Sequence, residues 1–186
     1  MARKIAVLVG SLRRESFTRK VATAIAELAP RELALEQLEI GDLPLYNQDL
    51  DTASPPEAWQ RLRDRVRACE AVLFATPEYN RSVPGVLKNA IDIASRPYGK
   101  SAWAGKPAAV VSVAPGNIGA FGANHHLRQM LVFLDMPALQ QPEMYINGAD
   151  KLFDAAGKLA NDTTRQLFVR FGAAFARWIE RNAQPR

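Results

Sequence analysis

The 186-residue sequence has one cysteine, two histidines and no long hydrophobic run. The single cysteine, Cys69, excludes an intramolecular disulfide and a multi-cysteine metal site, which agrees with a reducing compartment. The longest apolar runs, at residues 71–75 and 108–113, are far shorter than the roughly 20 residues that cross a bilayer. Residues 1–10 lack the hydrophobic region and cleavage site of a secretory signal. We therefore expect a cytoplasmic protein without a membrane partner.

Glycine is scarce in the first part of the chain, where Gly10 is the only glycine before Gly41. This disfavours a G-x-G-x-x-G dinucleotide fingerprint and a G-x-x-x-x-G-K-[ST] phosphate loop, and hence ATP hydrolysis. His125 and His126 are adjacent and point in different directions on a helix, without the i, i+4 spacing of a zinc site. No metal site is predicted. We expect one histidine in packing or a subunit interface and the other on the surface, with a substrate-pocket role as the alternative.

The composition is that of a globular protein, with 48% hydrophobic and 23% charged residues, and the length suits one domain over residues 1–186. The net charge of +5 favours anionic partners, which include nucleic acids, phosphorylated cofactors and anionic substrates. Arg61, Arg63, Arg65 and Arg67 have a spacing of two that spreads them around a helix. We interpret them as a solvated helix face and predict no nucleic-acid partner.

Hydrophobic periodicity predicts strands that alternate with helices. The predicted strands are residues 5–9, 33–40, 71–76, 108–113 and 138–145. The predicted helices are residues 18–28, 57–68, 84–94, 123–134 and 161–181, with a long loop at residues 42–56. Several strands are apolar throughout, so we expect an α/β doubly wound fold whose parallel sheet is covered on both faces. The second strand should lie nearer an edge, and the last helix should pack on the sheet.

Ligands of such a fold bind beyond the carboxyl ends of the strands, where the winding reverses, so the loops after strands one, three and four should meet. The first loop, residues 10–19, combines Gly10 with three hydroxyl residues and several arginines ahead of a helix. Ser11, Ser16 and Thr18 can donate hydrogen bonds, and Arg13 can add a charge-assisted contact. The pattern indicates an anion site, although a simple helix cap with solvated arginines fits this loop equally well when it is taken alone.

The second loop, residues 76–85, is polar and is held by Pro77 and Pro84. It has an aromatic ring and an amide, Tyr79 and Asn80, where a planar heterocycle can lie. The alternative is an ordinary connection between a strand and a helix.

Together the loops contain the motifs G-S-L-R-x-x-S at residues 10–16 and P-E-Y-N-x-S-x-P-G-x-L-K-N-A-I-D at residues 77–92. The sequence resembles the NADPH-dependent FMN reductase family, especially its bacterial quinone and chromate reductase branch. The likeness covers nearly the whole chain, including A-G-K-P at 104–107 and L-R-Q at 127–129. It implies a flavodoxin-like sheet in the order 2-1-3-4-5 and noncovalent FMN, with NADPH or NADH as the electron donor.

The resemblance also assigns the cofactor contacts. The phosphate and ribityl end would meet Ser11, Arg13, Ser16, Phe17 and Thr18. The ring would be wrapped by Pro77, Glu78, Tyr79, Asn80 and Arg81, with Ser112, Pro115 and Gly116 on its other side. The family commonly has a G-G-A-R-type segment after strand four, but residues 115–124 contain no arginine, which affects substrate preference and one set of subunit contacts.

The main hypothesis is a ping-pong enzyme, in which NAD(P)H reduces FMN and a quinone, free flavin or chromate then takes the electrons. No catalytic side chain is obligatory, because the flavin carries the hydride. The alternative is a flavodoxin-type electron carrier for a protein partner, although such carriers are generally acidic. The resemblance further implies a homodimer or homotetramer.

Overall fold

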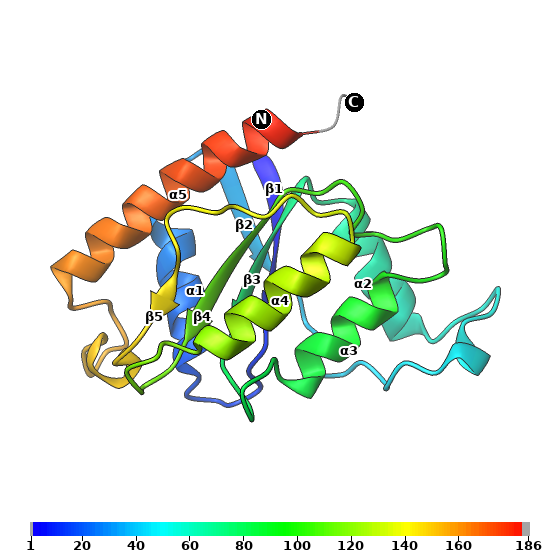
Figure 1. The fold of residues 1–186 in the computed structure, drawn as a ribbon, viewed down its shortest axis with the longest axis horizontal. Helices are drawn as coiled ribbons and strands as arrows, with labels where there is room; N and C mark the ends of the chain where they lie inside the picture. The colour runs from blue at the N-terminus through cyan, green and yellow to red at the C-terminus, as the bar shows by residue number, and fades with distance from the viewer. Residues whose placement is uncertain (1, 184–186) are drawn as a thin grey trace.

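The computed structural model describes residues 2–183, which form a parallel sheet between two layers of helices (Figure 1). The strands are β1 (Arg3–Val9), β2 (Leu33–Gln37), β3 (Ala71–Thr76), β4 (Ala108–Val113) and β5 (Tyr145–Ile146). The helices are α1 (Phe17–Leu28), α2 (Glu57–Arg67), α3 (Gly85–Ala94), α4 (Phe121–Phe133) and α5 (Asp162–Asn182), with short 3₁₀ helices at Gln48–Leu50 and Ala149–Lys151. The strand order is β2-β1-β3-β4-β5, which confirms the predicted flavodoxin-like topology.

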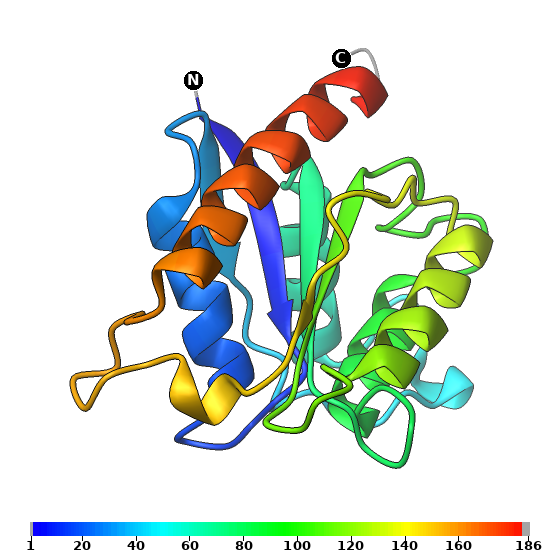
Figure 2. The ribbon, with the colours of Figure 1, turned by 60° about the vertical axis from the view of Figure 1, so that its left-hand side comes forward.

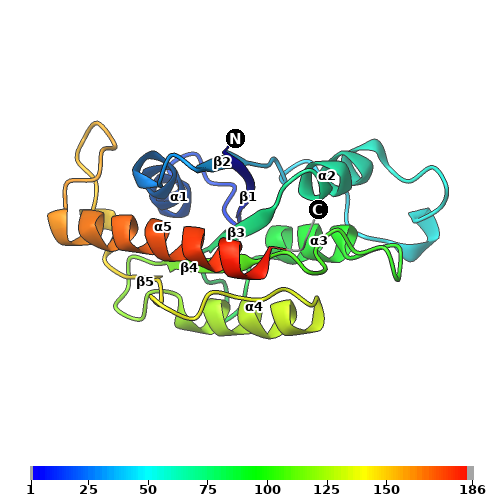
Figure 3. The ribbon, with the colours of Figure 1, turned by 90° about the horizontal axis from the view of Figure 1, so that it is seen from above.

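Alternate residues of β1 face the two helical layers. Ile5, Val7 and Val9 pack beneath α1 and α5, whereas Ala6 and Leu8 pack against the layer of α2, α3 and α4. Figures 2 and 3 show the helices on both sides of the sheet. Strands β3 and β4 are buried along their whole length, as expected for the centre of a parallel sheet. The predicted packing of α5 is confirmed, because it buries Phe168, Phe171, Phe175 and Ile179.

The carboxyl ends of the three central strands lie at the same end of the sheet. Val9 lies opposite Ala75, and Thr76 lies opposite Ser112, so the loops that follow β1, β3 and β4 start side by side. The beginning of β1 and the end of α5 lie at its other end (Figures 1 and 2). This arrangement gives the molecule one end built from loops and another where the described chain starts and finishes.

Strand β2 is shorter than the predicted residues 33–40, although its position at the sheet edge is as expected. Leu33 packs beneath α1 and α5, whereas Leu38 and Ile40 pack with α2 and α3. The chain therefore crosses from one face of the sheet to the other after Gln37. The apolar alternation continues across this bend, and for this reason the sequence pattern overestimates the strand.

The predicted length of the fifth strand is also wrong, since only Tyr145–Ile146 pairs continuously instead of residues 138–145. The preceding segment still runs beside β4, because Ala138 forms an isolated bridge with Ala108 and Met144 O accepts from Ser112 N at 2.9 Å. Between these contacts Pro142 has no N–H to donate, which prevents a continuous ladder.

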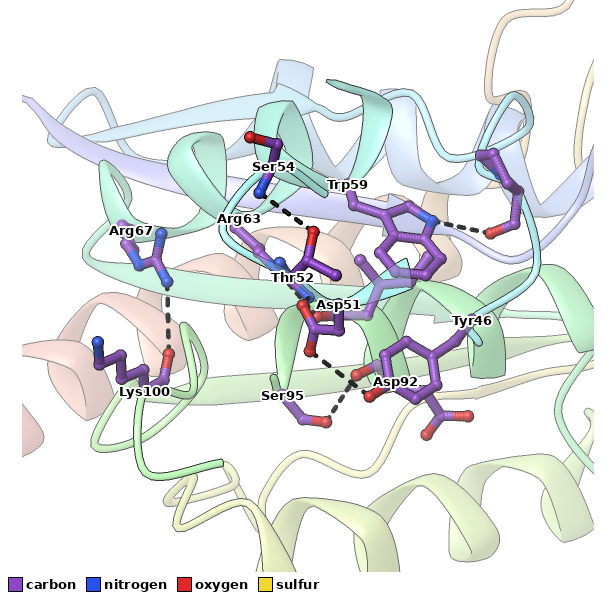
Figure 4. Close-up of polar contacts among 12 residues, drawn as sticks. Tyr46, Asp51, Thr52, Ser54, Trp59, Arg63, Arg67, Asp92, Ser95 and Lys100 are labelled. Carbon is purple, nitrogen blue, oxygen red and sulfur yellow. Dashed lines mark hydrogen bonds and ion pairs between the residues drawn. The ribbon is translucent and has the colours of Figure 1, made fainter. Parts of the chain in front are cut away.

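Arg63 contradicts the prediction that the arginines of residues 61–67 form a solvated face. Its side chain is 2% exposed, and Nη2 lies 2.8 Å from a carboxylate oxygen of Asp51 (Figure 4). Nε donates to Ile93 O at 3.0 Å, and the guanidinium lies 5.8 Å from the ring centre of Trp59. Because a spacing of two rotates successive arginines around the helix, one of them is turned into the core.

The long loop at residues 42–56 is fixed against α2 and α3. Trp59 Nε1 donates to Pro44 O at 2.9 Å, and the Tyr46 ring stacks on Trp59 with centroids 5.3 Å apart (Figure 4). Asn89 of α3 accepts from Tyr46 N at 2.8 Å and donates to Pro44 O at 3.1 Å. The loop is therefore an ordered part of the surface and lacks only regular secondary structure.

Cys69 is buried just after α2, where it packs as a small hydrophobic side chain. Desolvation raises the pKa of its thiol, and the same cause lowers the pKa of the Lys106 ammonium, which donates to Cys69 O. Among residues 2–183, no helix has both the length and the apolar character needed to cross a membrane.

Candidate functional site

A pocket of about 150 Å³ lies where the loops after β1, β3 and β4 meet. It is lined by Ser11, Arg13, Ser16, Phe17, Thr18, Pro77, Glu78, Tyr79, Val113, Ala114 and Pro115. A larger hollow of about 370 Å³ lies between α3 and α4, away from these strand ends. We place the functional site in the smaller pocket, because its position at the switch point of the sheet is where this architecture binds ligands.

The first loop begins with a close approach of the backbone to β3 and α3. Gly10 N donates to Ala75 O at 2.8 Å, and a Cβ at Gly10 would lie 3.2 Å from Leu87 and 3.3 Å from Pro77. Ser16 then caps α1, since its Oγ accepts from Arg19 N at 3.1 Å. The loop thus aims the start of α1 at the pocket.

The hydroxyls of this loop are available to a ligand. Ser11 and Thr18 are almost buried, and neither hydroxyl has a hydrogen-bond partner within residues 2–183. No fully buried side-chain polar atom in that part of the chain lacks a partner, so these two hydroxyls must reach the pocket surface. The predicted alternative of a simple helix cap accounts for Ser16 but leaves Ser11 and Thr18 without a role.

Some charged side chains of this loop are held by contacts within residues 2–183, whereas Arg13 is not. Arg19 donates to Ser11 O at 3.3 Å, and Lys20 donates to Glu15 at 2.7 Å, which lowers the pKa of the exposed Glu15 carboxyl. Arg13 is exposed and lines the pocket. A free guanidinium, open hydroxyls and a helix N-terminus form a donor set that fits a phosphate group.

The second loop makes a tight two-residue turn beside the pocket. Tyr79 N donates to Ser82 O at 2.9 Å and Ser82 N donates to Tyr79 O at 3.0 Å, while Asn80 and Arg81 have φ values of 50° and 65°. Two left-handed residues between paired ends define the hairpin turn whose twist suits short connections. The turn presents the half-exposed Tyr79 ring at the rim and keeps Asn80 and Arg81 at its tip, outside the pocket lining.

Glu78 joins this loop to α4. Its Oε2 accepts from Ala123 N at 3.0 Å, and its Oε1 lies 3.3 Å from an Arg81 nitrogen. Helix α4 has no cap from its own Ala120, so a carboxylate from a neighbouring loop satisfies its N-terminus. Gly122 permits this approach, because a Cβ there would lie 2.8 Å from Arg81 O.

Ser112 does not line the pocket, although we predicted a contact with the cofactor. The residue is fully buried, and its Oγ donates to Gly119 O at 2.7 Å and accepts from Asn124 Nδ2 at 3.1 Å. Its hydroxyl therefore holds the loop after β4 in place. Pro115 does line the pocket, whereas Gly116 is exposed outside it.

Val113 and Ala114 line the pocket and were absent from the predicted site. They offer no chemical motif, and only their position at the end of β4 would have marked them. The two histidines have different partners, since His125 Nε2 lies 3.0 Å from Tyr145 Oη and His126 Nδ1 lies 3.0 Å from Ser82 Oγ. Within the described chain, no group of three histidine, cysteine, aspartate or glutamate residues is placed to hold a metal ion.

Comparison with known proteins identifies the family. Residues 3–151 match the family described as NADPH-dependent FMN reductase. The chain belongs to this family. The chain is also similar to a quinone reductase of Pseudomonas putida, which is 64% identical over 178 residues, or 96% of this chain and 95% of that protein. A 2-hydroxy-1,4-benzoquinone reductase of a Burkholderia species is 45% identical over 96% of this chain and 97% of its own.

Solved structures agree with this assignment. The flavoenzyme NAD(P)H:(acceptor) oxidoreductase FerB of Paracoccus denitrificans has a TM-score of 0.92, is 43% identical, and covers 98% of this chain with all of its own. A flavodoxin of Pseudomonas aeruginosa, at 18% identity and a TM-score of 0.61, shares the fold. The predicted family, the oxidoreductase class, and the use of FMN with NAD(P)H are confirmed.

Proposed function

We propose that this FMN reductase family member passes electrons from NAD(P)H to quinones through FMN bound in the pocket at the ends of β1, β3 and β4. The observation that carries the proposal is the set of open hydroxyls and the free Arg13 beside the N-terminus of α1. Two relatives with high coverage are named for quinone reduction. When bound, FMN accepts a hydride and releases electrons in pairs or singly, so the protein must bind, orient and shield it.

The phosphate end of FMN would be held by the first loop. Ser11 and Thr18 donate through their hydroxyls, Arg13 supplies the positive charge, and Ser16 and Phe17 begin the helix whose free N–H groups face the phosphate. In this arrangement the charge of Arg13 and the hydrogen-bond donors stabilise the phosphate, and the proposal includes no metal ion.

The ring end would lie against the loops after β3 and β4. Pro77, Glu78 and Tyr79 form one wall, and Pro115 with the backbone of Val113 and Ala114 forms the other. The tip residues Asn80 and Arg81 and the turn residue Gly116 lie beyond this lining and would meet the ring's outer edge. Ser112 would act from behind the wall by fixing the loop that touches the ring.

Free flavins and chromate are further acceptors in this proposal, used in a ping-pong cycle at the site that NAD(P)H vacates. The net charge of +5 supports anionic reactants such as NADPH and chromate. We also place the protein in the cytoplasm as a single domain, an assignment supported by the one cysteine and by the single sheet that carries both apolar clusters.

A homodimer, or a homotetramer built from two dimers, completes the proposal. The hollow between α3 and α4 is bordered by Phe133, which is 85% exposed, and the adjacent Val132 is 81% exposed. Lys88, Asp92 and Arg96 line the same hollow and bring both signs of charge to it. A second copy of the chain, related by a twofold axis, suits such a self-complementary surface.

The test starts from purified protein supplied with FMN. We expect a yellow protein that oxidises NADPH or NADH steadily when 1,4-benzoquinone is present, with double-reciprocal plots that are parallel as in a ping-pong cycle. A yellow protein that fails to oxidise either nucleotide would instead be an electron carrier. A protein that stays colourless after gel filtration with FMN would overturn the assignment of the pocket.

A further inference from the structure

Three side chains beside the pocket form a continuous hydrogen-bonded chain. His125 Nε2 lies 3.0 Å from Tyr145 Oη, and this hydroxyl donates to Glu143 Oε1 at 2.9 Å. A tyrosine hydroxyl has one proton, which here goes to the carboxylate. Oη must therefore accept from Nε2–H of His125, so Nδ1 is the ring nitrogen that can gain or lose a proton.

His125, Tyr145 and Glu143 are not in the pocket lining, but two of them belong to elements that contact it. Tyr145 is opposite Ser112 in the sheet register, and the next three residues of the β4 connection line the pocket. Phe121 is the first residue of α4, and His125 follows it one helical turn later. The first turn of the helix contacts the pocket lining, because Ala123 N donates to Glu78 Oε2. The imidazole is exposed to solvent. The His125 ring is thus on an element that contacts the proposed flavin site, and it is open to proton exchange with solvent.

The same residues form an aromatic surface. The Phe121 centroid lies 4.1 Å from that of His125 and 5.3 Å from that of Tyr145, and the His125 and Tyr145 rings are inclined by only 10°. Phe121 is 47% exposed. Exposed rings of this kind stack on planar ligands, which is the shape of a quinone.

We propose that His125, supported by Tyr145 and Glu143, donates the proton that a quinone needs at this site. This inference rests on the proposed function. Conversion of a quinone to a hydroquinone forms two O–H bonds and takes up two electrons and two protons. The hydride equivalent of the oxidoreductase cycle brings both electrons and one proton, and the second proton leaves Nδ1 of the His125 imidazolium. The neutral imidazole keeps its Nε2–H bond to Tyr145 and regains a proton from solvent.

The charged groups around His125 are consistent with this role. Glu143 is the counter-charge to the imidazolium through Tyr145, whose pKa is raised by desolvation and then by Glu143, so its hydroxyl stays protonated. Arg128 on the same helix is held by Asn124 Oδ1 at 2.9 Å and Leu139 O at 3.0 Å. Across α4, Glu78 is paired with Arg81 and bound to the helix N-terminus.

The kinetic test compares two acceptors. 1,4-Benzoquinone takes up protons on reduction, whereas ferricyanide takes one electron and no proton, so the ferricyanide rate is the internal reference for each variant. We expect His125→Gln to lower the quinone-to-ferricyanide ratio on the order of 10²-fold, the lower end of general acid catalysis, and to remove the ratio's fall with rising pH. Tyr145→Phe should lower it less. His126→Gln, which alters the neighbouring histidine, should keep the wild-type ratio.

A wild-type ratio in His125→Gln would overturn the relay and leave the proposed function standing. If wild-type protein reduces neither acceptor with NAD(P)H, the proposed function fails and the relay fails with it.

A second measurement does not depend on turnover. Protein with ¹⁵N-labelled histidine contains two imidazole rings, which His126→Gln assigns. We expect the neutral His125 ring to have its proton on Nε2 and the Nε2 signal to move in both Tyr145→Phe and Glu143→Gln. A proton on Nδ1, or an Nε2 chemical shift that is unchanged in both variants, would contradict the hydrogen-bonded chain.

Discussion

At the scale of single residues, the buried ion pair of Arg63 and Asp51 should be the most sensitive charged contact. Arg63→Met would leave the Asp51 carboxylate, whose side chain is 6% exposed, without its cation, at a cost of about 3–5 kcal/mol in the free energy of unfolding. The double variant with Asp51→Leu should recover most of this loss. Urea denaturation followed by circular dichroism gives both values.

Arg61→Met is the matched control for that prediction. Arg61 pairs with Asp42 on the surface, where both side chains are about half exposed, so its loss should cost below about 1 kcal/mol. Equal destabilisation by the two arginine substitutions would contradict the role of Arg63.

Arg13 and Arg14 provide a second residue-scale comparison. Arg13 lines the pocket and Arg14, although also exposed, does not. We expect Arg13→Ala to weaken FMN binding by about tenfold, the effect of one partly screened charge-assisted hydrogen bond, and Arg14→Ala to change it little. Quenching of FMN fluorescence on titration measures both constants. Indistinguishable constants for the two variants would place the phosphate elsewhere.

The sequence predicts which residues reach the pocket where their chemistry and their position in a strand-loop-helix unit agree. Ser11, Ser16, Thr18 and Tyr79 were marked on both grounds, and all of them line the pocket. The sequence pattern does not reveal that Ser112 lies behind the pocket lining or that Arg63 is buried, because the environment of a polar side chain depends on partners far along the chain. The Ser112 hydroxyl is hydrogen-bonded to Gly119 and Asn124, and Arg63 is buried in an ion pair with Asp51.

At the scale of elements, the contact between α4 and the loop after β3 depends on Gly122, which has no side chain. Gly122→Ala would place a Cβ 2.8 Å from Arg81 O and 3.0 Å from the Glu78 carboxylate, so the helix or the loop must move. We expect a loss of about 1–3 kcal/mol in stability, together with weaker FMN binding, because the displaced Glu78 lines the pocket. Thermal denaturation and FMN titration check the two effects.

The control is Gly85→Ala, because nothing lies within 4 Å of a Cβ at that glycine and Gly85 is outside the pocket lining. If the Gly122→Ala protein has the same melting temperature and the same FMN affinity as the Gly85→Ala protein, the contact between α4 and the loop tolerates the added methyl group.

The strands show which elements can be predicted from the sequence and which cannot. The central strands β3 and β4 match their predicted ranges residue for residue, because an apolar run buried on both faces has no competing interpretation. The edge strands β2 and β5 differ from prediction because their lengths depend on where the chain leaves the sheet. Leu38 and Ile40 remain buried after that departure, and burial alone cannot mark the end of pairing.

At the scale of the whole molecule, the hollow between α3 and α4 should close against a second copy. Phe133→Glu places a charge on an exposed apolar position, so we expect the dimer to dissociate while the monomer keeps its fold. Val169→Glu on α5, at a position 47% exposed and outside the hollow, should leave the mass unchanged. Light scattering after gel filtration measures both, and a monomeric wild type or an intact Phe133→Glu dimer would contradict this assembly.

The separation between the loop end of the sheet and the end where β1 starts and α5 finishes has a practical consequence. A linker joined before Arg3 or after Asn182 leaves the molecule on the side away from the pocket (Figures 1 and 2). In protein tethered to an electrode or a bead through such a linker, the proposed FMN site would therefore face the solution. Attachment through Tyr79 or Pro115 instead would obstruct the entry of nucleotide and acceptor.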